Sequence, residues 1–203
     1  MMISFSGLAP EVAEAMCTPM HLILPSGPPS SPRLQCSNPG ALYLGSISAV
    51  LDPSILKEHD IHHLVQVLDV PWLPASEQDG YECYRLDILD LESQDLKPHL
   101  EDAVEDIDSA LRRGRNVLVH CQQGVSRSAA IVIAYLIRKR GMSFDSAITF
   151  VRQRRPCIKP NSGFVRCLRE WERQWIPHPA CTPTVFERSC PVVNHTTLIS
   201  SLF

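Results

Sequence analysis

The stretch His120-Cys121-Gln122-Gln123-Gly124-Val125-Ser126-Arg127-Ser128 joins two segments of different pattern. Before it, Val117-Leu118-Val119 is a short apolar run typical of a strand in the centre of a sheet. After it, residues 128–140 are apolar nearly all round and are followed by Gly141, which predicts a buried helix. A strand, a tight loop and a helix in this order are typical of an α/β fold.

The loop between this strand and this helix has the features of an anion-binding site. Its main-chain N–H groups are expected to point inward, and the start of the helix adds partial positive charge. The loop residues that would bind phosphate are Gln122, Gln123, Gly124, Val125, Ser126 and Arg127. Gly124 permits the main-chain geometry at the middle of the loop, and Arg127 can fold back so that its planar guanidinium group grips two phosphate oxygens.

Cys121 lies at the mouth of this loop, where the field that binds phosphate also stabilises a thiolate. A free thiol has a pKa near ~8.5, and helix N-termini and adjacent cations lower such values to ~3.5–7.5. A thiolate here is suited to attack phosphorus. Ser128 places a hydroxyl near the sulfur, where it would help the thiolate to leave when water breaks a phosphocysteine. This chemistry requires no metal and no other cofactor.

The rest of the region from 40 to 176 alternates between strand and helix patterns. Strands are predicted at 42–44, 63–68 and 84–88, and helices near 53–56, 96–111, 144–155 and 163–175. The alternation predicts a central mixed, mostly parallel sheet flanked by helices on both sides. Residues 1–39 hold seven of the 17 prolines and are interpreted as a flexible leader, and residues 177–203 as a flexible tail.

Charge is distributed unevenly along the chain, although its formal sum is only −3. Residues 77–108 hold 12 acidic side chains against two basic ones, and residues 111–173 hold 14 basic side chains against three acidic ones. The basic stretch either attracts an anionic substrate or belongs to helix faces that partly neutralise the acidic stretch. The low net charge does not favour nucleic acid as a partner, and no apolar run reaches the roughly 18 residues of a membrane span.

The eight cysteines form no CxxC pair, and no thiols and imidazoles are grouped at the spacing of a zinc site. No secretory leader is recognisable, because the first basic residue is Arg33 and two glutamates precede it. We therefore expect a cytoplasmic or nuclear location, free thiols and no metal. We also expect a monomer that does not bind a membrane.

The segment 120–128 has the pattern His-Cys-five residues-Arg-Ser, and it resembles the signature of the cysteine-dependent protein-tyrosine phosphatases. Over about residues 40–176 the chain is similar to their dual-specificity branch, on the segments Val117 to Ala130, Ala134-Tyr135-Leu136, Arg154-Arg155-Pro156 and Pro160-Asn161-Ser162-Gly163-Phe164. The resemblance implies a small phosphatase domain of tyrosine-phosphatase-like fold that acts on phosphoproteins. It also implies a pocket shallow enough to admit phosphoserine and phosphothreonine as well as phosphotyrosine.

Two supporting residues follow from the same resemblance. In similar phosphatases the histidine before the cysteine helps to orient the loop and to keep the pKa of the thiol low, which assigns this role to His120. The asparagine after proline ties a neighbouring loop to the site, which assigns that role to Asn161.

A leaving alkoxide or phenoxide needs a proton, and Asp87, Asp90 and Asp95 are the candidate donors. Asp87 falls within a predicted strand, and Asp95 suits the N-cap of the following helix. In the resembled family the acid lies on a loop between a strand and the long helix. This favours Asp90, 31 residues before Cys121, as the general acid.

Two other functions remain open from the sequence. A phosphatase for phosphoinositides or RNA 5′-phosphates would gain from basic residues between Cys121 and Arg127, where the five residues here are neutral. A non-catalytic phosphate-binding scaffold would be expected to lack the nucleophile, the arginine or the acid, and all three residue types are present.

Overall fold

A computed structural model of the chain describes residues 7–27, 39–70, 75 and 77–176. Its centre is a five-stranded sheet with the order β1-β2-β5-β3-β4. The strands are β1 (Met20–Leu24), β2 (Leu42–Ser46), β3 (Ile61–Val67), β4 (Glu82–Leu86) and β5 (Asn116–Cys121). β1 is antiparallel to β2 and the other neighbours are parallel, which confirms the mixed, mostly parallel sheet.

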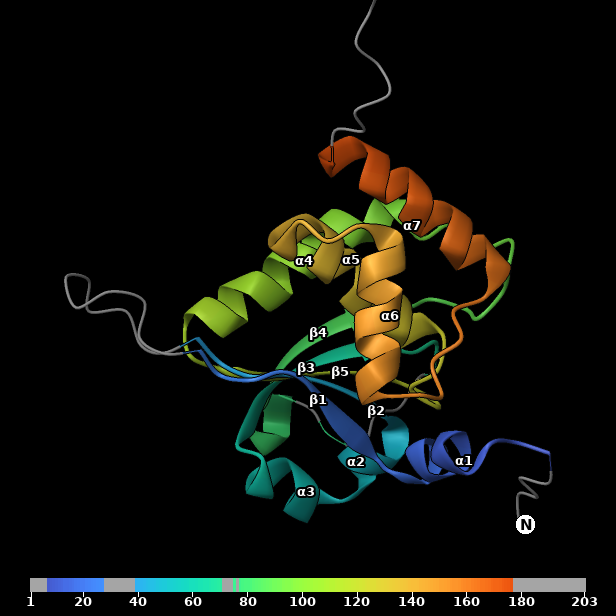
Figure 1. Cartoon of the computed structure of the whole chain (residues 1–203). Coiled ribbons are helices and arrows are strands. Elements are labelled where there is room, and N and C mark those ends of the chain that lie inside the picture. The colour runs from blue at the N-terminus through green and yellow to red at the C-terminus, as the bar shows by residue number, and fades with distance from the viewer. Residues whose placement is uncertain (1–6, 28–38, 71–74, 76, 177–203) are drawn as a thin grey trace, which may run out of the picture.

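Helices lie on both sides of this sheet (Figure 1). On one side are α4 (Lys97–Arg112), α5 (Arg127–Arg140), α6 (Phe144–Arg154) and α7 (Ser162–Trp175), and on the other α1 (Pro10–Cys17), α2 (Ile47–Leu51) and α3 (Pro53–Glu58). A short 3-10 helix, η1 (Glu77–Asp79), precedes β4. In β5, Val117 and Val119 join the apolar core under α4–α7, and Leu118 joins the core on the opposite side. The central strand is thus covered on both faces, as its continuous apolar run predicts.

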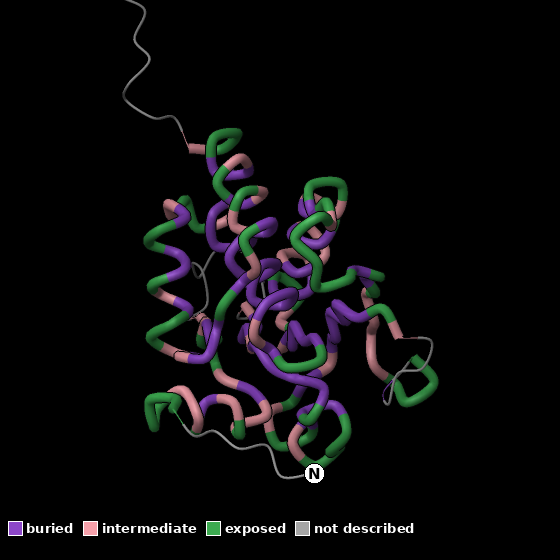
Figure 2. The backbone as a smooth tube through the Cα atoms, turned by 90° about the vertical axis from the view of Figure 1, so that its right-hand side faces the viewer, coloured by how far each residue is buried: buried purple, intermediate pink, exposed green. Residues whose placement is uncertain are grey.

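α5 is buried along most of its length, which explains why its sequence has no polar face. Every residue from Arg127 to Ile137 is buried, and Figure 2 shows the buried part of the backbone gathered inside the molecule. The helix packs against α4, α6, α7 and the sheet. It ends at Gly141, whose φ of 62° is a left-handed value that suits glycine.

The acidic and basic segments of the sequence meet where α4 packs against α5. Lys139 pairs with Glu105 and, at 3.5 Å, with Asp108. Arg138 Nε lies 3.6 Å from a carboxylate oxygen of Glu101. For these two helices the charge pattern therefore reflects faces that partly neutralise each other.

The N-terminal part of the chain differs from the prediction of a flexible leader over residues 1–39. Residues 10–17 form α1 and residues 20–24 form β1, an edge strand whose Met20 and Ile23 are buried. Pro10 begins α1, where a helix needs no N–H donor, and Pro19 and Pro25 flank β1 without interrupting it. The prediction is wrong here because the prolines mark the ends of elements. Residues 28–38 and the predicted tail 177–203 lie outside the described residues.

Three further findings concern the described ranges alone. No helix there is long and apolar enough to cross a membrane. No group of three or more His, Cys, Asp or Glu side chains there is arranged to hold a metal ion. The five cysteines that the structure describes are free thiols.

Candidate active site

Three parallel strands end at one edge of the sheet and bring the candidate catalytic residues together. β5 ends at Cys121, Asp69 comes shortly after the end of β3, and Asp90 comes shortly after the end of β4. Because β5, β3 and β4 are neighbours in this order, their carboxyl ends meet, as they do at the ligand sites of open α/β sheets. The loop after β5 then leads into the N-terminus of α5.

This loop turns its main-chain carbonyl groups outward. Four consecutive carbonyl oxygens, those of residues 122–125, accept hydrogen bonds from outside the loop. The first accepts from the Ile47 N–H at 3.3 Å and the last from the Lys159 N–H at 2.8 Å. The two in the middle accept from Arg155: Nη2 donates to the Gln123 oxygen at 3.1 Å, and Nε donates to the Gly124 oxygen at 2.9 Å. In a trans peptide the N–H points away from the C=O, so the N–H groups of residues 123–126 face the inside of the loop. Such a ring of inward donors suits an anion.

The sulfur of Cys121 lies against this ring, and the residue is only 2% exposed. The Gly124 N–H donates a hydrogen bond to Sγ at 3.2 Å, and Ser128 Oγ, in the first turn of α5, donates another at 3.1 Å. Hydrogen bonds to an anion are stronger than those to a neutral group, so both donors favour a negatively charged sulfur. Gly124 has a φ of 68°, and a Cβ there would lie 2.5 Å from the Gly45 carbonyl oxygen, so only glycine fits.

Arg127 is anchored through one nitrogen and open at another. Nη1 donates to Asp69 Oδ1 at 2.9 Å and to the main-chain oxygen of Ile88 at 3.2 Å. Nε is buried and finds no hydrogen-bond partner among the described residues, since Asp90 Oδ2, at 3.9 Å, is too far away. Buried donors without a partner are rare in folded proteins. A phosphate oxygen is the kind of acceptor that would satisfy this one.

Asp90 is held beside the loop by two donors. Its Oδ1 accepts a hydrogen bond from Ser126 Oγ at 2.7 Å and another from Asn161 Nδ2 at 2.8 Å. Asn161 is fixed in turn as the N-cap of α7, where its Oδ1 accepts the Phe164 N–H at 2.9 Å. The Asp90 side chain remains 38% exposed. It is therefore both oriented and accessible to a substrate.

The other two candidate acids have different contacts. Asp87 Oδ1 pairs with Arg85 Nε at 2.7 Å. Asp95 Oδ1 accepts the Lys97 N–H at 3.0 Å and so caps the start of α4. In the described part of the chain, neither carboxylate forms a hydrogen bond or ion pair with the loop. The geometry thus favours Asp90 among the three.

His120 precedes Cys121 at the end of β5 and is fully buried. Burial lowers the pKa of its imidazole to about 4, and the nearby Cys121 main chain offsets only part of this effect. Neither ring nitrogen reaches hydrogen-bond geometry with a residue that the structure describes. The ring is neutral at pH 7 and adds no positive charge beside the thiol. The supporting role that the resemblance implies for His120 stays a prediction.

Two residues of the site, Asp69 and Arg155, are not among those predicted from the sequence. Asp69 anchors Arg127, and Arg155, wholly buried, binds two carbonyl groups of the loop. The available signal for Asp69 is its place directly after a predicted strand, where parallel strands present functional side chains. Arg155 belongs to the segment Arg154-Arg155-Pro156, which is part of the family resemblance, but the sequence does not show which of the two arginines contacts the loop.

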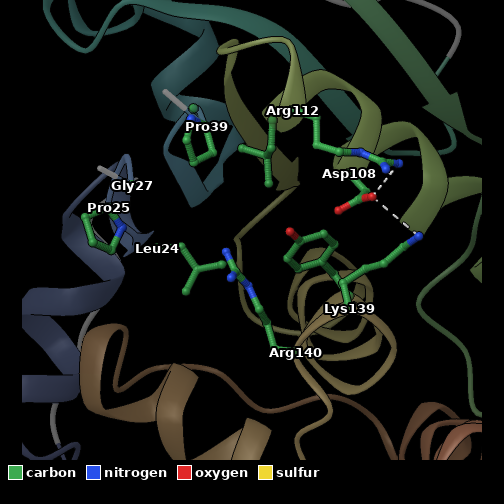
Figure 3. Close-up of a pocket in the computed structure, with 11 residues that line it drawn as sticks. Leu24, Pro25, Gly27, Pro39, Asp108, Arg112, Lys139 and Arg140 are labelled. Carbon is green, nitrogen blue, oxygen red and sulfur yellow. Dashed lines mark ion pairs between the residues drawn. The ribbon is translucent and has the colours of Figure 1, made fainter. Parts of the chain in front are cut away.

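A cavity of about 390 Å³ lies at the other end of α5 (Figure 3). Arg112 and Lys139 line it, and both pair with Asp108, at 2.7 and 3.5 Å. α5 is 14 residues long, and at about 1.5 Å per residue its two ends are roughly 20 Å apart. The cavity is thus separate from the loop that holds Cys121.

Comparison with known proteins establishes the family. A family model described as the catalytic domain of dual specificity phosphatases matches residues 42–174. The chain belongs to the dual-specificity protein phosphatase family. Dual specificity protein phosphatase 1 of Arabidopsis thaliana is 37% identical over 132 residues, which cover 65% of this chain and 66% of that protein.

Two further relatives show the range of the family. The serine/threonine/tyrosine-interacting protein of Mus musculus is 35% identical over 164 residues, which cover 77% of this chain and 74% of that protein. The crystal structure of human DUSP28 has a TM-score of 0.66 and 30% identity, and the match covers 77% of this chain and 95% of that one. The resemblance in sequence and the tyrosine-phosphatase-like fold are thereby confirmed. α1 and β1 lie outside residues 42–174.

Proposed function

We propose that this chain is a protein phosphatase that hydrolyses phosphotyrosine, phosphoserine and phosphothreonine through a phosphocysteine intermediate. One observation carries the proposal: the Cys121 sulfur, the unsatisfied Nε of Arg127 and the Asp90 carboxylate surround the same loop of inward N–H groups. The name of the Arabidopsis relative supports the substrate class, since it is a dual specificity protein phosphatase.

In the first step the phosphoryl group of the substrate occupies the ring of N–H groups. Cys121 Sγ attacks phosphorus, so that an S–P bond forms while the bond between phosphorus and the leaving oxygen breaks. Asp90 transfers its proton to that oxygen, and the alcohol or phenol departs neutral. Arg127 binds the non-bridging oxygens, on which the charge of the transition state is spread.

In the second step water attacks the phosphorus of the phosphocysteine. Asp90, now a carboxylate, takes a proton from this water, and the P–S bond breaks to release inorganic phosphate. The sulfur leaves as a thiolate, which the hydrogen bonds from Ser128 Oγ and the Gly124 N–H stabilise. The cycle restores the starting protein and consumes only water.

The direct test compares wild type with Cys121→Ser on an aryl phosphate and on phosphopeptides, in reducing buffer. We expect the variant to bind a phosphopeptide but to show no turnover, because a serine hydroxyl is a far weaker nucleophile than a thiolate. Cys83→Ser is the control, since this half-buried thiol lies in β4 outside the loop. Substantial turnover by Cys121→Ser would exclude the phosphocysteine mechanism.

Two alternatives are tested in the same assay. Gln122 and Gln123 are exposed and neutral, whereas a substrate with several phosphate groups would favour cations here, so we expect phosphopeptides to be hydrolysed faster than phosphoinositides or triphosphate-ended RNA. A scaffold function is suggested by the 35% identity to a protein named for its interactions. Binding of phosphopeptides by wild type without any turnover would establish the scaffold instead.

A further inference from the structure

Arg155, the residue after α6, is a buried cation behind the anion loop. Its side chain is fully buried, and each nitrogen of the guanidinium group donates a hydrogen bond. Nε and Nη2 bind the carbonyl oxygens of Gly124 and Gln123 from outside the loop, at 2.9 and 3.1 Å. Nη1 binds the carbonyl oxygen of Thr18 at 3.0 Å and the Nδ1 of His21 at 2.7 Å.

None of these partners carries a negative charge. Burial, and to a lesser extent Arg155 itself, lowers the pKa of His21 to about 4, so this imidazole is neutral at pH 7 and accepts the hydrogen bond. Burial also raises the pKa of the neighbouring Cys157 thiol, which keeps it neutral. Within the described residues, no carboxylate forms an ion pair with Arg155. A guanidinium group nevertheless stays protonated in proteins.

A buried charge without a counter-ion is costly, and folded proteins normally pair such charges. The site on the inner side of the loop offers the missing anion, either the thiolate of Cys121 or a bound phosphate group. Burial lowers the pKa of the Arg155 guanidinium group, and negative charge on the nearby sulfurs of Cys157 and Cys121 would act in the opposite direction. The loop thus lies between one arginine in front, Arg127, and another behind it.

We propose that Arg155 is a positioning residue of the active site, which holds the loop carbonyls outward and supplies positive charge behind the anion that the loop binds. The proposal rests on the proposed function, because it treats this loop as the phosphate site. Gly124 is part of the same arrangement, since a Cβ there would lie 2.8 Å from Arg155 Nη2.

The proposal also assigns a role to the N-terminal elements. Thr18 follows α1, and His21 lies in β1, and both residues precede the range 42–174 that the family model matches. Their two acceptors fix the edge of the guanidinium group that faces away from the loop. Thr18 and β1 therefore support the phosphate site indirectly, because they hold the side of Arg155 that faces away from the loop.

The test uses the full chain and two measurements that need no turnover. The first is the rate at which iodoacetamide modifies Cys121 as a function of pH, followed by mass spectrometry of the peptide that contains it. The second is the affinity for inorganic phosphate, measured by calorimetry. Arg155→Gln is compared with Arg155→Lys and with the control Arg154→Gln. Arg154 is half-buried, donates to the Phe150 carbonyl of its own helix and stacks on the Phe150 ring, so it is a matched neighbour outside the site.

For Arg155→Gln we expect about tenfold slower modification of Cys121 at pH 6, with an unchanged limiting rate at high pH, because an opposite charge at close range moves a titration by about one unit or more. Phosphate affinity should fall at least about tenfold. Arg155→Lys should keep most of the modification rate, since its charge remains, but lose phosphate affinity, since one amine cannot replace the planar fork. Equal losses of modification rate in both variants would overturn the role of the charge.

His21→Ala tests the same proposal if Arg155→Gln does not fold. Its control is Leu22→Ala, because Leu22 is the next residue of β1 and is 44% exposed. We expect His21→Ala to weaken phosphate binding about threefold and Leu22→Ala to leave it unchanged. Unaltered phosphate affinity and modification profiles in both Arg155→Gln and His21→Ala would overturn the inference. Failure of the proposed function would appear differently, as absence of turnover in wild type.

Discussion

Asn161 makes two contacts that substitution can separate. Its Oδ1 caps α7 through the Phe164 N–H, and its Nδ2 holds the carboxylate of Asp90. Serine is as favourable as asparagine at an N-cap, so Asn161→Ser should keep the helix cap. The serine side chain is one bond shorter and does not reach Asp90. Asn161→Ala removes both contacts.

The expected magnitudes differ for stability and for catalysis. Loss of an N-cap costs about 1 kcal/mol, so the free energy of unfolding should fall by about this amount in Asn161→Ala and by less than about 0.5 kcal/mol in Asn161→Ser. Asp90 keeps its bond from Ser126 Oγ but loses the one from Asn161 in both variants. A correctly placed general acid contributes about 10²–10⁴-fold to the rate. Loss of one of the two donors that orient Asp90 should remove part of this contribution, about 10- to 100-fold.

Urea unfolding and steady-state kinetics measure the two effects separately. With phenyl phosphate, a poor leaving group, kcat/KM should fall about 10- to 100-fold in both variants. With 2,4-dinitrophenyl phosphate, whose leaving group needs no proton, it should change less than about threefold. Ser162→Ala, an exposed neighbour at the start of α7, serves as control. An equal fall on both substrates, or full activity of Asn161→Ser on phenyl phosphate, would refute the assignment of Asp90 as an acid held by Asn161.

Three further outcomes are expected. Arg127→Lys keeps the positive charge beside Asp69 but loses the planar guanidinium group. The value of kcat/KM for an aryl phosphate should therefore fall at least about 100-fold. A fall of less than tenfold would contradict binding of phosphate through two nitrogens of Arg127. The pKa of His120 is about 4 in the folded chain against an ordinary 6.5, so the unfolded chain takes up the proton first as the pH falls. His120 should therefore lower the free energy of unfolding by about 3 kcal/mol between pH 6.5 and 4. His21 contributes a similar drop, so urea titrations should find the total drop smaller by about 3 kcal/mol in His120→Asn, and an unchanged drop would contradict a buried neutral His120. Burial and two nearby carboxylates raise the pKa of the Cys83 thiol to about 11. At pH 7, mass spectrometry should therefore show that iodoacetamide modifies Cys121 well before Cys83. The reverse order would contradict a reactive Cys121.

The centre of the site could be predicted from the sequence because its geometry is local. Strand, loop and helix follow one another directly, so the places of Cys121, Arg127 and Ser128 depend on neighbours in the chain. Asp90 needed the family resemblance, because three carboxylates lie near the same strand. The contacts that distinguish Asp90 come from Ser126 and Asn161, which lie 36 and 71 residues away in the chain.

Other parts of the molecule depend on packing that no local pattern reveals. The many prolines of residues 1–39 predict an irregular segment, so the five residues of β1 are not recognisable as a strand from composition. β1 is an edge strand that is defined by its pairing with β2. Arg155 resembles Arg154 in the sequence, and contacts with distant parts of the chain, at Thr18, His21 and the loop carbonyls, distinguish Arg155 as a buried cation. Burial also decides the charge of His120, which its position beside Cys121 does not show.

The connection between α6 and α7 meets the active site at three points within residues 155–161. Arg155 binds two loop carbonyls, the Lys159 N–H binds the carbonyl of Val125, and Asn161 holds Asp90. Inserting or deleting one residue between these points would displace at least one of them by about 3.5 Å, the reach of one residue of extended chain. A change in length at a place 34 residues after Cys121 would thus disable catalysis while leaving the signature motif intact. The length of this connection is therefore part of the active site, although its residues lie outside the signature motif.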